Sequence, residues 1–229
     1  MRIATLLLLL AAEAAASESP SPRNSLQPCD AEDVVTEVGE IIRTPELGSV
    51  IVSFTAFPSF GTEYGLVVFK TSDAFMLRAV EFDHSVFHSA YREVRPGLFA
   101  HDPAKANIDR SIDEVEISSE LAQLVHSVVA GEVATATKLP EGWFGLDGET
   151  FRFSSGNESC ATTWSPDNPS RPGQLVEAME SLHNLASVPT SWLRSLWEPS
   201  VSKKFMKLRR RDKPNKPLQP IAREDARSG

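Results

Sequence analysis

The sequence predicts a single α+β domain in which an antiparallel β-sheet is covered by two or three helices. Short segments of alternating polarity, rich in β-branched and aromatic residues, are typical of strands and are concentrated between residues 50 and 82. Turn-forming residues join neighbouring segments, which favours antiparallel hairpins. Two longer stretches, 120–136 and 171–186, have the 3.6-residue apolar spacing of amphipathic helices. We expect these helices to cover the sheet within residues 30–200.

The first half of the domain is predicted to begin with a helix and to continue as a sheet. Asp30 is a favourable N-cap for a one-faced apolar pattern that ends before Pro45, although its valines and Gly39 lower the helix propensity. Strands are then predicted at 50–54, 64–71 and 75–82, of which the last two form a hairpin. A short helix at 83–94 and a loop at 95–108 follow, and Ile112 to Ile117 indicates another strand.

The second half is predicted to be organised around residues 141–185. Asp147 and Gly148 mark a tight turn, because glycine tolerates a positive φ. Strands are expected at 151–153 and 159–164, on either side of a polar turn. Ser170 then caps the helix at 171–186, and a last helical turn is expected at 190–197.

Residues 1–16 have the pattern of a secretory signal peptide. Arg2 provides a positive start, an apolar segment follows, and the alanines at 14–16 precede a cleavage point. The apolar segment is too short to cross a bilayer of about 30 Å. We therefore expect an exported protein, periplasmic or secreted, with a flexible leader at 17–29 and no transmembrane segment after cleavage. The alternative is that the segment is retained as an anchor.

The charge of the chain is unevenly distributed. From Lys203 to the end there are ten basic and three acidic residues, a net charge of +7. Because the whole chain has a net charge of −8, residues 1–202 carry −15. An acidic body argues against nucleic-acid binding. Residues 201–229 are predicted to form a basic, disordered tail.

The two cysteines, Cys29 and Cys160, are predicted to form a disulfide, because an isolated pair in an exported protein is most simply one bridge. The alternative is two free thiols. Their separation does not resemble the spacing of metal ligands.

The last residues, 214–229, read PNKPLQPIAREDARSG. This segment resembles the translated recombination-site tails of bacterial integron gene cassettes, in which NKPLQ-type sequences end unrelated proteins. The resemblance implies a bacterial, mobile-cassette origin and a tail acquired by read-through. It implies nothing about the activity of the domain.

No motif in the chain predicts a catalytic residue, a metal site or a cofactor. His84 and His88 lack a third ligand, and we expect His126 and His183 to be partly exposed helix residues. The serines lie outside any G-x-S-x-G context, and no glycine-rich phosphate loop is present. Acidic pairs such as Glu63 with Asp147, or Asp147 with Glu149, leave open an exported hydrolase that uses dispersed acidic or histidine residues.

Aromatic residues in loops rich in proline and glycine favour a non-catalytic binding module. Its partner would be a protein, a peptide or a glycan, bound through turns around 57–63 and 143–168. The predicted binding residues are Phe57, Phe60, Trp143, Phe144, Asp147 and Trp164. The alternative is that these aromatic side chains pack against the sheet and the last helix.

Overall fold

The computed structural model describes residues 22–29, 34–43, 47–102, 107–138, 147–156 and 159–210. The short 3₁₀ helix η1 (Pro22–Asn24) begins this part of the chain. The strands are β1 (Gln27–Pro28), β2 (Ser49–Pro58), β3 (Tyr64–Lys70), β4 (Phe75–Phe82), β5 (Tyr91–Arg95), β6 (Leu98–His101), β7 (Arg110–Ile117), β8 (Glu149–Ser155) and β9 (Ser159–Trp164). The helices are α1 (Val34–Ile42), α2 (Val86–Ala90), α3 (Ser119–Ala134), α4 (Arg171–Ala186) and α5 (Ser191–Arg210).

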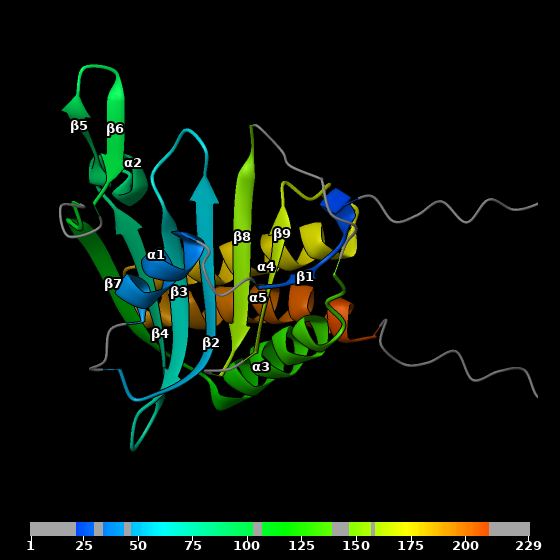
Figure 1. The fold of residues 1–229 in the computed structure, drawn as a ribbon. Coiled ribbons are helices and arrows are strands. Elements are labelled where there is room, and N and C mark those ends of the chain that lie inside the picture. Colours follow the sequence, from blue (N-terminus) through cyan, green and yellow to red (C-terminus); the bar gives the residue numbers. More distant parts are fainter. Residues whose placement is uncertain are drawn as a thin grey trace, which may run out of the picture.

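Seven strands form one antiparallel sheet in the order β1-β9-β8-β2-β3-β4-β7. Helices α3, α4 and α5 lie on one face of this sheet, and α1 lies on the other (Figure 1). The β3–β4 hairpin is present with Tyr64 opposite Glu81 and Lys70 opposite Phe75. The predicted α+β domain with an antiparallel sheet is confirmed.

The central strands are buried on both faces because helices cover both sides of the sheet. Successive side chains on a strand point to opposite faces, so Leu66 and Val68 of β3 join the larger core beneath α3, α4 and α5. Val67 and Phe69 join a smaller core that includes Ile42 of α1. This two-sided burial explains the almost continuous apolar run in β3.

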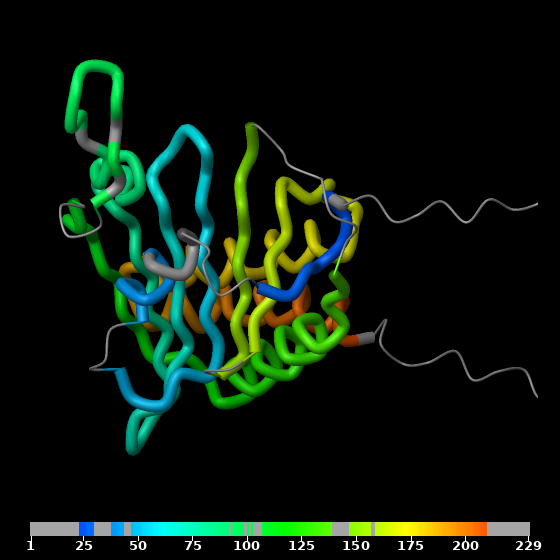
Figure 2. The backbone as a smooth tube through the Cα atoms, viewed as in Figure 1, coloured from blue at the N-terminus to red at the C-terminus, as the bar shows by residue number. Residues whose placement is uncertain are grey.

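Residues 83–108 differ from the prediction. The helix is limited to α2, and β5 and β6 form a separate hairpin where a helix end and a loop were expected. Gly97 has a φ of 74°, a conformation that glycine adopts without strain, and this permits the reversal between the strands. Figure 2 shows the hairpin projecting beyond the end of the main sheet.

The predicted leader at 17–29 is wrong for residues 22–29. Strand β1 pairs with β9, with Gln27 opposite Thr162, and Leu26 is buried in the larger core. The predicted disulfide between Cys29 and Cys160 is confirmed, with 5.6 Å between the Cα atoms. The bond ties the beginning of the described chain to an interior strand of the sheet. Residues 1–21, including the predicted signal, lie outside the described residues.

The predicted disordered tail is wrong for residues 201–210, which continue α5. Val201, Phe205 and Leu208 follow one another at spacings of four and three residues, so they lie on one helix face. All three are buried, and α5 packs against α3 and α4. This apolar face was missed because it is interleaved with lysine and arginine. Residues 211–229, including the segment that resembles a cassette tail, lie outside the described residues.

Replacing Phe205 by alanine is expected to lower the free energy of unfolding by about 3–5 kcal/mol, because a fully buried phenyl ring would leave a cavity. Urea unfolding of the disulfide-bonded protein measures the change. Met206→Ala is the matched control, because the side chain of Met206 is exposed next to Phe205 in the sequence. This substitution should lower the free energy of unfolding by less than about 0.5 kcal/mol. Equal midpoints for wild type and Phe205→Ala would contradict the ordered C-terminal half of α5.

Candidate functional site

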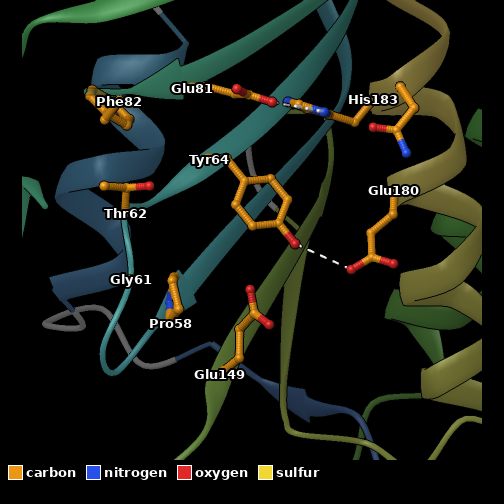
Figure 3. A pocket seen from close by; sticks show the side chains of 10 residues that line it. Pro58, Gly61, Thr62, Tyr64, Glu81, Phe82, Glu149, Glu180 and His183 are labelled. Carbon is orange, nitrogen blue, oxygen red and sulfur yellow. Dashed lines mark hydrogen bonds and ion pairs between the residues drawn. The ribbon is translucent and has the colours of Figure 1, made fainter. Parts of the chain in front are cut away.

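A hollow of about 620 Å³ opens at one end of the central strands, where β2 and β4 end and where β3 and β8 begin. Helix α4 forms its opposite wall. The lining residues include ionisable side chains from three strands or strand ends and from the helix (Figure 3). These are Tyr64, Glu81, Glu149, Glu180 and His183.

Strand pairing brings the sheet residues of the hollow together. Glu149 begins β8 opposite Pro58, which ends β2, and Tyr64 begins β3 opposite Glu81 of β4. Directly opposed residues on neighbouring strands point to the same face. On α4, Glu180 and His183 are three residues apart and therefore share a helix face. The residues of the hollow are thus brought together by the pairing of strands that are distant in the sequence and by their spacing on helix α4.

The backbone before Glu149 is fixed by close contacts. Ser59 N donates to Gly148 O at 2.8 Å, which joins the 57–63 turn to the start of β8. Glu149 N donates to Ser165 Oγ and Ser165 N donates to Glu149 O, both at 2.8 Å. A Cβ at position 148 would collide with Ser165 Oγ and with the Trp164 indole, so glycine is required there.

Tyr64 lies between two carboxylates. Its hydroxyl donates to Glu180 Oε1 at 3.2 Å, and Figure 3 shows the Glu149 side chain approaching from the other side. Burial raises the pKa of Tyr64, and the charges of Glu149 and Glu180 raise it further. Tyr64 therefore remains a protonated hydrogen-bond donor throughout the physiological pH range.

Glu149 is the carboxyl group whose pKa is raised. Burial is the largest cause and the nearby charge of Glu180 adds to it, whereas the interaction with the Tyr64 hydroxyl lowers the pKa. The site consequently holds two neighbouring carboxylates that repel each other when both are ionised. A bound cation would relieve that repulsion.

His183 supplies a buried polar atom to the same hollow. The residue is 4% exposed, and its ring packs edge-on against Tyr64 with 5.4 Å between the ring centroids. Its Nδ1 lies 3.9 Å from Glu81 Oε1, whereas Nε2 has no hydrogen-bond partner among the described residues. Buried polar atoms of this kind are uncommon, because each costs free energy when it is left unsatisfied. The expectation that His183 would be partly exposed is wrong; His126 is exposed.

A second hollow of about 330 Å³ adjoins the first, and Glu149 and Glu180 line both. Its other residues include Ser165 and Pro166 from the loop before α4 and Glu177 from the helix itself. We refer to the two hollows together, with Tyr64, Glu81, Glu149, Glu180 and His183, as the acidic groove. It follows α4 along the end of the sheet.

The six predicted binding residues are only partly associated with the groove. Phe60 is 84% exposed in the turn that supplies Pro58 and Gly61 to the lining. Phe57 is half-buried, with its ring 5.4 Å from that of Phe87.

Asp147 is exposed next to the turn that leads into Glu149. Trp164 is half-buried, and the Arg23 guanidinium lies 4.7 Å from its ring centroid. Trp143 and Phe144 lie outside the described residues. The two predicted turn regions therefore border the groove, although most of the lining side chains are different residues.

The acidic pair of Glu63 with Asp147 does not form a site. Glu63 is buried and accepts hydrogen bonds from Ser85 Oγ and from the amides of Val86 and Phe87, so it caps the N-terminus of α2. Glu149, by contrast, does belong to the groove. Tyr64, Glu81, Glu180 and His183 were missed by sequence reasoning. The one local signal was the pairing of Glu180 with His183 on the apolar helix at 171–186.

Comparison of the chain with protein-family models, with curated proteins and with solved structures gave no match.

The pKa shift of Glu149 predicts a pH-dependent stability. Because its pKa is higher in the folded state, the proton is held more tightly there, and this stabilisation is lost as pH rises from the ordinary value of 4.5 through the raised one. Glu149→Gln should therefore gain stability relative to wild type as pH rises through this window. Urea unfolding at a series of pH values measures the difference, with Glu116→Gln, an exposed residue of β7, as the control. If the difference in free energy of unfolding between wild type and Glu149→Gln did not vary with pH, the raised pKa of Glu149 would be contradicted.

Proposed function

We propose that this chain is an exported, non-catalytic binding domain whose acidic groove takes a peptide or small ligand that carries an ammonium or guanidinium group. The observation that carries the proposal is the composition of the larger hollow. Glu81, Glu149 and Glu180 enter it from three different elements, and its lining in the described part of the chain contains no lysine or arginine. A hollow with this excess of negative charge favours a cation.

The hydrogen-bonding groups support the same ligand class. An ammonium or guanidinium group donates several hydrogen bonds and accepts none, and carboxylates are acceptors. Charge-assisted bonds of this kind are stronger in a partly buried site than in water, because the local dielectric constant is lower. His183 Nε2 is a further buried atom without a partner in the described chain, and in its unprotonated form it is an acceptor for a donating ligand.

The rim of the groove supports a ligand that also has an apolar part. Phe60 is exposed in the turn that borders the larger hollow, and an aromatic face attracts both alkyl chains and cations. Lysine and arginine side chains combine an apolar stem with a charged end. The extension of the groove into the second hollow fits several residues of a peptide better than a single small ion.

Two observations support export. Residues 1–16 have the pattern of a signal peptide, and the Cys29–Cys160 disulfide belongs to an oxidising compartment. The acidic charge of the body disfavours nucleic acid as the partner. The resemblance of the tail to integron cassettes supports a bacterial origin for the proposed domain.

Arginine- and lysine-containing peptides are expected to bind, whereas matched peptides with citrulline or acetyl-lysine are not. Glu180→Gln should weaken the affinity about tenfold, because it removes one charge-assisted hydrogen bond. Isothermal titration calorimetry measures the affinities, and Glu116→Gln is the control on a distant strand. Equal binding of charged and neutral peptides would contradict the proposal.

The affinity for the basic peptide is expected to increase as pH rises through the raised pKa of Glu149, because the cation binds the ionised carboxylate. In Glu149→Gln, this part of the pH dependence should be absent. Calorimetry over the same pH series gives the comparison. An affinity that falls with rising pH in wild type would exclude Glu149 as a ligand-binding carboxylate.

A second candidate function is an exported hydrolase, and the neighbouring carboxyl groups of Glu149 and Glu180 are the observation that favours it. Hydrolases that use two acidic residues require one protonated and one ionised carboxyl, and different environments separate their pKa values. Turnover of a bound peptide or glycoside that is abolished by both Glu149→Gln and Glu180→Gln would replace the binding proposal. Recovery of the intact ligand after prolonged incubation would exclude the hydrolase for that ligand.

A further inference from the structure

Helix α5 carries a concentration of exposed apolar side chains that the acidic groove does not use. Trp192, Leu196 and Trp197 are 63%, 65% and 56% exposed, and they lie within two turns of the helix. Phe205 and Leu208 are buried against the rest of the domain on the side of α5 opposite Trp192 and Leu196. Trp197, although exposed, is four residues before the buried Val201 and therefore lies nearer to that buried side. Exposed apolar side chains that lie together mark an interaction site more often than a single exposed residue does.

The same outward face continues as a basic surface. Trp192, Leu196, Lys203 and Lys207 are separated by four, seven and four residues, which places them along one side of an α-helix. All four are exposed, and the distance from the first to the last is about 22 Å at the helical rise. Lys203 and Lys207 have no ion pair among the described residues. We call these four residues the outer stripe.

Acidic side chains are almost absent from α5. Its sequence contains one, Glu198, and that carboxylate accepts hydrogen bonds from the amide and the hydroxyl of Ser118 at the start of α3. Glu198 is therefore turned towards the domain. After α5, the sequence continues with Arg211, Asp212 and Lys213, which together add a net charge of +1.

We propose that the outer stripe docks on the surface of an anionic lipid bilayer, with α5 lying along the membrane. Tryptophan prefers the boundary between headgroups and acyl chains, and a helix with tryptophan, leucine and lysine on its surface lies in that plane. Lysines near an anionic leaflet add electrostatic attraction, which acts within about 10 Å. None of the helices in the described part of the chain is long and apolar enough to cross a membrane.

Vesicle flotation tests this directly. The exported protein is used with its N-terminus verified by mass, so that wild type and variants all lack the apolar segment at 1–16. It should float with phosphatidylcholine vesicles that contain about 30% phosphatidylglycerol and not with pure phosphatidylcholine. Trp192→Ser/Leu196→Ser and Lys203→Glu/Lys207→Glu should each reduce the partition coefficient about tenfold or more. Added salt should weaken binding of the wild type.

The controls are substitutions of the same kind at exposed positions elsewhere, Leu98→Ser on β6 and Lys138→Glu after α3, and they should bind vesicles like wild type. Tryptophan fluorescence should shift to shorter wavelength only with anionic vesicles. Equal binding to neutral vesicles, or unchanged binding of either α5 variant, would overturn the proposal. A dimer in sedimentation that Trp192→Ser/Leu196→Ser dissolves, without vesicle binding, would assign the stripe to a second copy instead.

Discussion

The antiparallel pairing of β2 with β8 is the constraint on which the rest of the structure depends. It joins residues 52–58 to residues 149–155, and it places Phe54 opposite Phe153 and Pro58 opposite Glu149. The centroid of the Phe54 ring lies 5.9 Å from that of Phe151 and 5.4 Å from that of Phe153. These three rings form the aromatic centre of the core beneath the helices. A slip of one residue would turn every β8 side chain to the other face. The aromatic core and the acidic groove are therefore fixed by the same register.

The helix layer is positioned by a few polar contacts between otherwise apolar surfaces. The buried Glu132 of α3 pairs with Arg171 at the start of α4, where Arg171 Nε donates to Glu132 Oε1 at 2.6 Å. Glu198 of α5 accepts hydrogen bonds from the amide and the hydroxyl of Ser118, which is the N-cap residue of α3. Removing Arg171 would leave the buried carboxylate of Glu132 without its partner, which is costly in a site with little water. Because Glu180 and His183 lie on α4, the position of that helix determines the width of the groove.

The two edges of the sheet, formed by β1 and β7, are protected in different ways. At one edge, β1 and the Cys29–Cys160 disulfide cover β9, and the chain-entropy model gives a bridge over so long a loop a stabilisation of about 4–5 kcal/mol. At the other edge, β7 exposes Asp113, Glu114 and Glu116, and charged side chains discourage pairing with further strands. Acidic residues thus protect an edge in one place and build a groove in another. The acidic residues of β7 and those of the groove differ only in how far they are buried and in which side chains surround them.

Local sequence patterns determined the elements of this protein, and tertiary contacts decided its site. Alternation, helical spacing, caps and the cysteine pair predicted the sheet, the hairpin, α3, α4 and the disulfide, because each depends on neighbouring residues or on one simple pairing rule. The extension of α5 was missed because Phe205 and Leu208 lie among basic residues, and only their burial distinguishes that segment from a solvated tail. Tyr64, Glu81, Glu149, Glu180 and His183 are separated by up to 119 positions in the chain. Apart from the spacing of Glu180 and His183 on one helix, nothing local links these residues to one another. They acquire a common role only where strand register and the placement of α4 bring them to one hollow.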